Sequence, residues 1–148
     1  MLILCCGHTD RGDGAAGPLV ANRLHAVDVK AHVLTGEAYS LMEAWRDADE
    51  VVVVDAVVTG APHGTVSSWD AVMEDLSGRW FRSMPHLLGV AEAVGIARNN
   101  GTLPRRLRIY GIEGRYFELG SRPSSVVLRA VDRLADDIAA EVAIASPL

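Results

Sequence analysis

The stretch Val51-Val52-Val53-Val54-Asp55 decides the fold that this sequence predicts. Four consecutive β-branched residues are typical of a strand that is buried on both faces, as in a parallel sheet. Open α/β sheets bind their ligands beyond the carboxyl ends of their strands. Asp55 therefore lies where a functional carboxylate is expected, although an aspartate just after a strand also commonly begins a turn.

Strand-like and helix-like patterns alternate along the rest of the chain. We expect strands at residues 2–6, 29–34, 51–55, 65–69 and 107–112, and helices at residues 15–24, 38–47, 86–99 and 124–144. This alternation predicts one α/β domain over residues 1–148, with a parallel sheet wrapped by helices. Residues 70–85 lack a clear pattern, and we interpret them as a short helix and a mobile loop.

The composition excludes several classes of protein. The chain has 148 residues, 49% of them hydrophobic, and a net charge of −5, so neither a nucleic acid nor an anionic membrane is expected as a partner. Cys5 and Cys6 are adjacent, and neighbours on a strand point to opposite faces, so a mutual disulfide is not expected. Two reduced thiols and a strand pattern at the start, with no leader segment, predict a cytoplasmic protein without a membrane span.

The loop that follows the first predicted strand is rich in glycine and aspartate. Residues 7–14 have the sequence Gly-His-Thr-Asp-Arg-Gly-Asp-Gly, which matches neither GxGxxG nor GxxxxGK[ST], so no nucleotide cofactor is predicted. The carboxylates of Asp10 and Asp13 are hard oxygen ligands and suit a cation better than a phosphate. Asp13 could equally cap the helix that follows.

A histidine begins the helix predicted at residues 86–99. The positive end of the helix dipole disfavours protonation of His86, and a neutral imidazole is the form that binds metals. His86 could also serve as a helix cap or be partly buried. A first-loop carboxylate, Asp55 and His86 together predict an open, three-ligand site for a divalent metal at the carboxyl edge of the sheet, with His8 and His63 as weaker candidates.

The order of these motifs resembles the nickel-iron hydrogenase maturation endopeptidases. In that family a loop of the form GNxxxxD(D/E)xxG, a VDA segment and a histidine that opens a later helix follow one another along the chain. The matching segments are residues 7–18, 54–56 with 60–65, 83–92 and 110–114. The resemblance covers nearly the whole chain, and its specificity comes from the order and spacing of the motifs together.

The resemblance implies a fold and an activity. The fold is an α/β three-layer sandwich, with a mostly parallel, five-stranded twisted sheet flanked by helices on both faces. The activity is removal of a C-terminal extension from the precursor of the [NiFe] hydrogenase large subunit. The nickel ion that the endopeptidase binds is supplied by this precursor, and no organic cofactor is expected. Asp55 and His86 match two nickel-binding positions of the family, and we expect them to be the catalytic pair.

The third nickel-binding position of the family departs from its usual residue. The acid that follows the first aspartate in the family falls on Gly14 here. Asp13 is the expected substitute, with Asp10 and His8 as weaker ones. Two hypotheses follow: an active endopeptidase, or a catalytically impaired relative that binds the precursor, as a chaperone does, without cutting it.

Overall fold

The computed structural model describes the backbone of residues 1–76 and 85–145, and the side chains of these residues except 85–88. The strands in this part are β1 (Leu2–Cys6), β2 (His32–Leu34), β3 (Glu50–Val57), β4 (Val66–Asp70) and β5 (Arg106–Glu113). The helices are α1 (Ala16–Ala26), α2 (Ala38–Trp45), α3 (Pro85–Asn100) and α4 (Ser125–Ala145), with a short 3-10 helix, η1 (Gly12–Ala15).

The five strands form one mixed sheet in the order β2-β1-β3-β5-β4. The β1–β2, β1–β3 and β3–β5 pairs are parallel, and the β4–β5 pair is antiparallel. The antiparallel edge corrects the expectation of a parallel sheet. Residues 58–65 turn the chain back directly after β3, and a parallel return would need a crossover of about a dozen residues or more.

The strands and helices predicted outside residues 70–85 are all present in the described residues, with shifted ends. β3 continues to Val57 because it pairs with β5 along its whole length, so Asp55 lies inside the strand instead of at its end. Residues 12–15 form η1 where a loop was expected. The short helix and mobile loop were predicted for residues 70–85; residues 71–74 form a turn and a bend instead of a helix, and residues 77–84 lie outside the described part. None of the described helices is both long and apolar enough to cross a bilayer.

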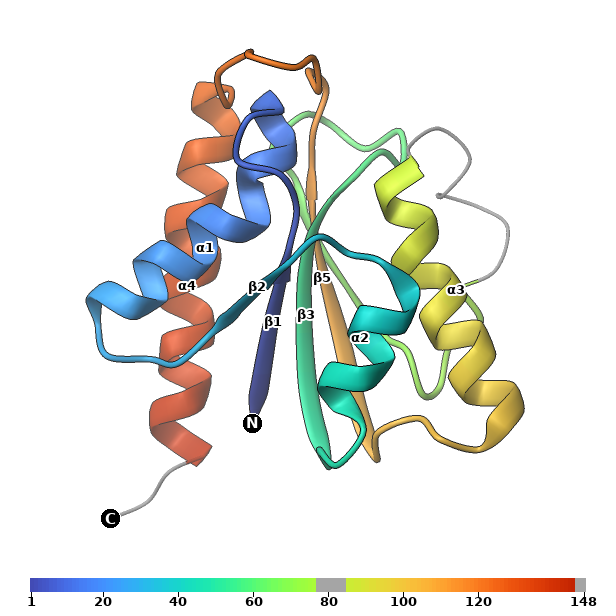
Figure 1. Cartoon of the computed structure of the whole chain (residues 1–148). Helices are drawn as coiled ribbons and strands as arrows, with labels where there is room; N and C mark the ends of the chain where they lie inside the picture. The colour runs from blue at the N-terminus through green and yellow to red at the C-terminus, as the bar shows by residue number, and fades with distance from the viewer. Residues whose placement is uncertain (77–84, 146–148) are drawn as a thin grey trace.

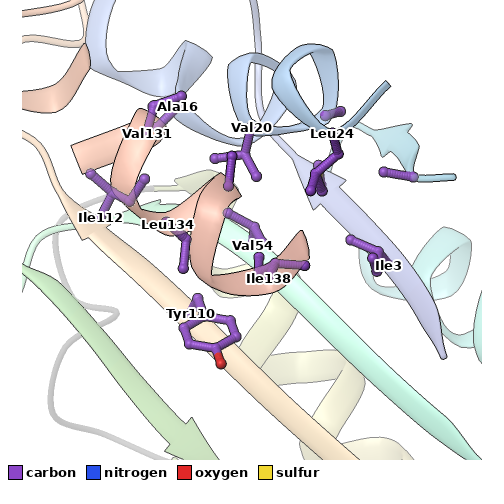
Figure 2. Close-up of a cluster of buried hydrophobic side chains, with 14 of the residues drawn as sticks. Ile3, Ala16, Val20, Leu24, Val54, Tyr110, Ile112, Val131, Leu134 and Ile138 are labelled. Atoms are coloured by element: carbon purple, nitrogen blue, oxygen red, sulfur yellow. The ribbon is translucent and has the colours of Figure 1, made fainter. Parts of the chain in front are cut away.

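Helices cover both faces of the sheet. Figure 1 shows α1 and α4 on one face and α2 and α3 on the other. Alternate residues of β3 separate the two hydrophobic clusters: Val52 and Val54 pack with α1 and α4, whereas Val51 and Val53 pack with α2 and α3. Figure 2 shows the first cluster, in which α1 and α4 contribute Val20, Leu24, Val131, Leu134 and Ile138.

The two cysteines confirm the alternation expected of a strand. Both are free and buried. Cys5 belongs to the cluster under α1 and α4, and Cys6 belongs to the cluster under α2 and α3. The absence of a mutual disulfide is therefore a consequence of β1 geometry.

The close approach of α1 to β1 depends on a glycine, and this dependence is testable. A Cβ on Gly17 would overlap the carbonyl oxygen of Cys6, which belongs to the sheet and cannot move cheaply. We therefore expect Gly17→Ala to lower the free energy of unfolding by about 1–3 kcal/mol, measured by urea denaturation. The matched control is Gly95→Ala in α3, where a Cβ meets nothing within 4 Å. That variant should be neutral or more stable by up to about 1 kcal/mol, and equal losses in both variants would contradict the packing argument.

Candidate functional site

Three buried acidic residues lie toward the carboxyl edge of the sheet. Within the described residues, Asp13, Asp55 and Glu113 are the charged side chains that are almost completely removed from solvent. A buried carboxylate is costly unless hydrogen bonds or a cation compensate its charge. The three residues differ in how far the protein provides that compensation.

Asp13 in η1 accepts hydrogen bonds through both carboxylate oxygens. Its Oδ1 accepts from the backbone N–H of Ser124 at 2.7 Å. Its Oδ2 accepts from the N–H groups of Arg115 and Tyr116 at 2.8 and 3.1 Å and from the Ser124 hydroxyl at 3.1 Å, and it lies 2.9 Å from Nε2 of His63. Burial alone would raise the pKa of Asp13, but these donors outweigh it and the pKa is lowered.

This set of contacts gives Asp13 a structural role. It fastens the loop of residues 114–124 and the turn that carries His63 onto η1. A metal ion at Asp13 would have to displace several of these donors, so the contacts weigh against the predicted ligand role, which stays a prediction. The adjacent Gly14 has room for a Cβ atom, which would lie in ordinary contact at 3.4 Å from Cβ of Arg11 and 3.6 Å from Cδ1 of Phe117.

Glu113, at the end of β5, organises the turn after β3. Its carboxylate accepts the N–H of Thr59 at 2.9 Å, the Thr59 hydroxyl at 2.6 Å and the N–H of Gly60 at 3.3 Å. A cavity of about 340 Å³ lies beside this turn, with His63, Glu113 and Arg115 in its lining. Glu113 and Asp13 therefore both use their charge to hold loops in place.

Asp55 differs from the other two acids because one of its oxygens has no hydrogen-bond partner among the described residues. The residue is 1% exposed and sits on β3 opposite Gly111 of β5. Its Oδ1 accepts the N–H of Ala56 at 2.8 Å, while the buried Oδ2 accepts no hydrogen bond within the described part of the chain. Burial raises the pKa of Asp55 well above its usual range, against the smaller effect of the Ala56 bond. Such an oxygen needs either a proton or a cation.

Cys6 is the neighbour of Asp55 on the next strand. The register pairs Cys5 with Val54, so Cys6 and Asp55 follow side by side on the face that α2 and α3 cover. The pKa of Cys6 is also raised, first by burial and then by the negative charge of Asp55. The sequence analysis did not place Cys6 beside Asp55, because the register between β1 and β3 cannot be read from either segment alone.

The first turn of α3 carries His86 to the same edge of the sheet. A Cβ on Gly89 would overlap the carbonyl oxygen of Gly36, which lies just beyond the end of β2. The beginning of α3 therefore packs against the carboxyl edge, as Figure 1 also shows. The side chain of His86 is not described, so its predicted pairing with Asp55 at a metal site stays a prediction.

The weaker metal candidates stay predictions, and the structure places them as follows. Asp10 is exposed, and its backbone carbonyl accepts the N–H of Gly120. His8 is half-buried, with its backbone N–H bound to the carbonyl of Gly14, and His63 contacts Asp13. Among the side chains that the structure describes, no three His, Cys, Asp or Glu groups converge as a metal site. The described part of the predicted site is thus Asp55, with Cys6 beside it.

These features place the chain among the open-sheet α/β proteins whose site lies at the carboxyl edge of the sheet. The family model described as "HycI: Hydrogenase maturation protease" matches residues 25–141. The chain therefore belongs to the hydrogenase maturation protease family, which confirms the resemblance drawn from its motifs.

Solved structures agree with this assignment. The chain is similar to the hydrogenase maturating endopeptidase HybD from Escherichia coli, with 19% identity, a TM-score of 0.76 and coverage of 98% of this chain and 93% of that one. It is also similar to the [NiFe] hydrogenase maturation protease HybD from Thermococcus kodakarensis, with 21% identity, a TM-score of 0.73 and coverage of 95% and 97%. The corresponding values for HycI from Thermococcus kodakarensis KOD1 are 25%, 0.65, 93% and 88%. No curated protein matches the chain significantly.

The hydrogen bonds of Asp13 predict a dependence of stability on acid pH. Since the folded-state pKa of Asp13 is lowered, its stabilisation is present above the unfolded-state value of about 3.9 and is lost as the pH falls through the folded-state pKa. We expect Asp13→Asn to lose about 1.5–3 kcal/mol of unfolding free energy near pH 7 and to approach the wild type below about pH 4. The control is Asp10→Asn, exposed on the same loop, with an effect within about 0.5 kcal/mol. A deficit of Asp13→Asn that is independent of pH would contradict this explanation.

The unpaired carboxyl of Asp55 predicts the opposite dependence. Its folded-state pKa is raised, so the wild type loses stability as the pH rises from about 3.9, the usual value, toward the folded-state pKa. Relative to Asp55→Asn, the loss should reach about 1.4 kcal/mol per pH unit in that window and then level off. Urea denaturation of both proteins at a series of pH values, with a chelator present, measures this difference. Parallel stability curves for the two proteins would contradict it.

Proposed function

We propose that this protein is a cytoplasmic endopeptidase that removes the C-terminal extension of a nickel-loaded [NiFe] hydrogenase large-subunit precursor. Family membership supports a protease in hydrogenase maturation. One observation carries the finer proposal: the Oδ2 oxygen of Asp55, buried toward the carboxyl edge, has no hydrogen-bond partner among the described residues. A cation brought by a substrate would supply the missing partner.

The proposed recognition has two parts. Asp55 offers a carboxylate oxygen to the nickel ion of the precursor, and His86 offers an imidazole from the first turn of α3. Because the ion arrives with the substrate, a nickel-free precursor leaves Asp55 unpaired and binds less tightly. Discrimination between the nickel-loaded and the nickel-free precursor then depends on the difference between their affinities for this site. The bound ion would also act as a Lewis acid on the scissile carbonyl or an attacking water.

The loop of residues 114–124 and the turn at Thr59 and Gly60, which together we call the rim of the site, support this role because they are held in place before any substrate binds. Asp13 fixes the loop of residues 114–124, and Glu113 fixes the turn at Thr59 and Gly60. Both anchors use buried, charge-assisted hydrogen bonds, which are stronger than neutral ones. A rim that is already ordered lowers the entropic cost of positioning a precursor chain.

A cleavage assay tests the proposal. We expect the wild type to remove the extension from a nickel-loaded precursor, detected as a loss of intact mass, and to leave a nickel-free precursor whole. Asp55→Asn and His86→Ala should slow cleavage by about 10–100-fold or more, since each removes one metal contact. Asp136→Asn, which changes an exposed acid on α4, is the control and should cleave normally. Equal cleavage of nickel-free and nickel-loaded precursor would overturn nickel recognition.

A second function is a precursor-binding module that does not cut. It is favoured by Gly14, which offers no side chain, and by Asp13, whose carboxylate oxygens are already occupied by protein donors. In the same assay this function would appear as binding of the nickel-loaded precursor without loss of the extension. Gly14→Asp, whose Cβ the backbone at this position accommodates, should then create cleavage activity.

A further inference from the structure

The most unusual juxtaposition in the described residues is a thiol beside the unpaired carboxyl. β1 and β3 are adjacent parallel strands, about 4.8 Å apart, and their register places Cys6 next to Asp55. Cys6 packs in the cluster that contains Val53 and Val57, the residues two before and two after Asp55 on the same face of β3. The two side chains therefore project from neighbouring strands toward the same space.

The two groups are both acids, and both are almost completely buried. Cys6 is 0% exposed and Asp55 is 1% exposed. If both were ionised without a counterion, their charges would repel each other in a medium of low dielectric constant. A divalent cation between them reverses this relation, because it favours the charged form of each group. Asp13 and Glu113 cannot take the place of Cys6, since protein donors already occupy them.

We propose that the Cys6 thiolate is a ligand of the precursor's nickel ion, bound together with Asp55. The inference rests on the proposed function, because it adds a sulfur ligand to the same nickel-recognition site. On binding, the S–H bond of Cys6 breaks and its proton passes to solvent, together with any proton that Asp55 held in place of the cation, and lone pairs of the sulfur and of the Asp55 carboxylate form the bonds to the metal. The oxidation states of sulfur and nickel do not change.

A sulfur ligand determines which cations the site prefers. Thiolate is a soft ligand that favours late transition and thiophilic ions, whereas carboxylate alone suits Mg²⁺ and Ca²⁺. One sulfur and one oxygen would select Ni²⁺, Zn²⁺ or Cd²⁺ over the abundant hard cations. This selectivity would keep the unpaired oxygen of Asp55 from being filled by magnesium.

Metal titration of the full chain, without any precursor, tests the inference. With Ni²⁺ or Cd²⁺ under reducing conditions, we expect a thiolate-to-metal charge-transfer band in the near ultraviolet. Cys6→Ala should lose the band and weaken binding by about tenfold or more. Cys5→Ala is the matched control: the neighbouring thiol faces the opposite cluster, so that variant should keep the band. Asp55→Asn should weaken binding but retain the band.

The outcomes separate this inference from the proposed function. A wild type without the band, or a Cys6→Ala variant that keeps it, would overturn sulfur ligation. If the variants fail to fold, X-ray absorption of the nickel-loaded wild type decides, with a sulfur neighbour at about 2.3 Å expected and a shell of only nitrogen and oxygen contradicting it. Sulfur ligation without precursor cleavage would overturn the protease proposal alone. Normal cleavage by Cys6→Ala, without the band in the wild type, would overturn the sulfur ligand alone.

Discussion

β3 lies in the middle of the sheet, hydrogen-bonded to β1 on one side and to β5 on the other, and this position governs the chemistry of Asp55. A carboxyl group on a central strand is shielded by neighbouring strands at its sides and by helices above, so little water reaches it. Its ionisation must then be supported by protein donors or by an ion. Within residues 1–76 and 85–145, the donor to this carboxylate is a single N–H, from Ala56.

The three buried acids show two uses of the same functional group. Asp13 and Glu113 accept hydrogen bonds from N–H and hydroxyl donors of segments far apart in the chain, and these bonds hold the loop of residues 114–124 and the turn after β3 in place. In the part of the chain that the structure describes, Asp55 accepts one hydrogen bond, from its own neighbour Ala56, and fastens no loop. Proteins commonly retain strained or unsatisfied groups at functional positions and compensate for them elsewhere in the fold. The number of protein donors therefore distinguishes the two acids that hold loops from Asp55, whereas burial is nearly the same for all three.

Much of the fold could be predicted from local patterns, because strands and helices carry their periodicity in the sequence. The run of valines from Val51 to Val54 indicated the central strand, and the alternation of Cys5 and Cys6 indicated two faces. The strand β4 was predicted, but its antiparallel direction was not, because the direction depends on which strand it pairs with. The contacts of Asp13 with Ser124 and His63 join segments that no local pattern relates. Cys6 can be placed beside Asp55 only when the register between β1 and β3 is known, and this register is seen only in the paired strands of the structure.

Gly36 and Gly89 set the distance between the beginning of α3 and the edge of the sheet. Neither residue carries a side chain that could bind a ligand, yet their contact fixes where the helix that bears His86 starts. Enlarging Gly89 would push that helix outward and lengthen the span between a histidine on its first turn and the acid on β3. A larger residue at position 89 would therefore change the geometry of the proposed nickel site without altering either of its proposed ligands.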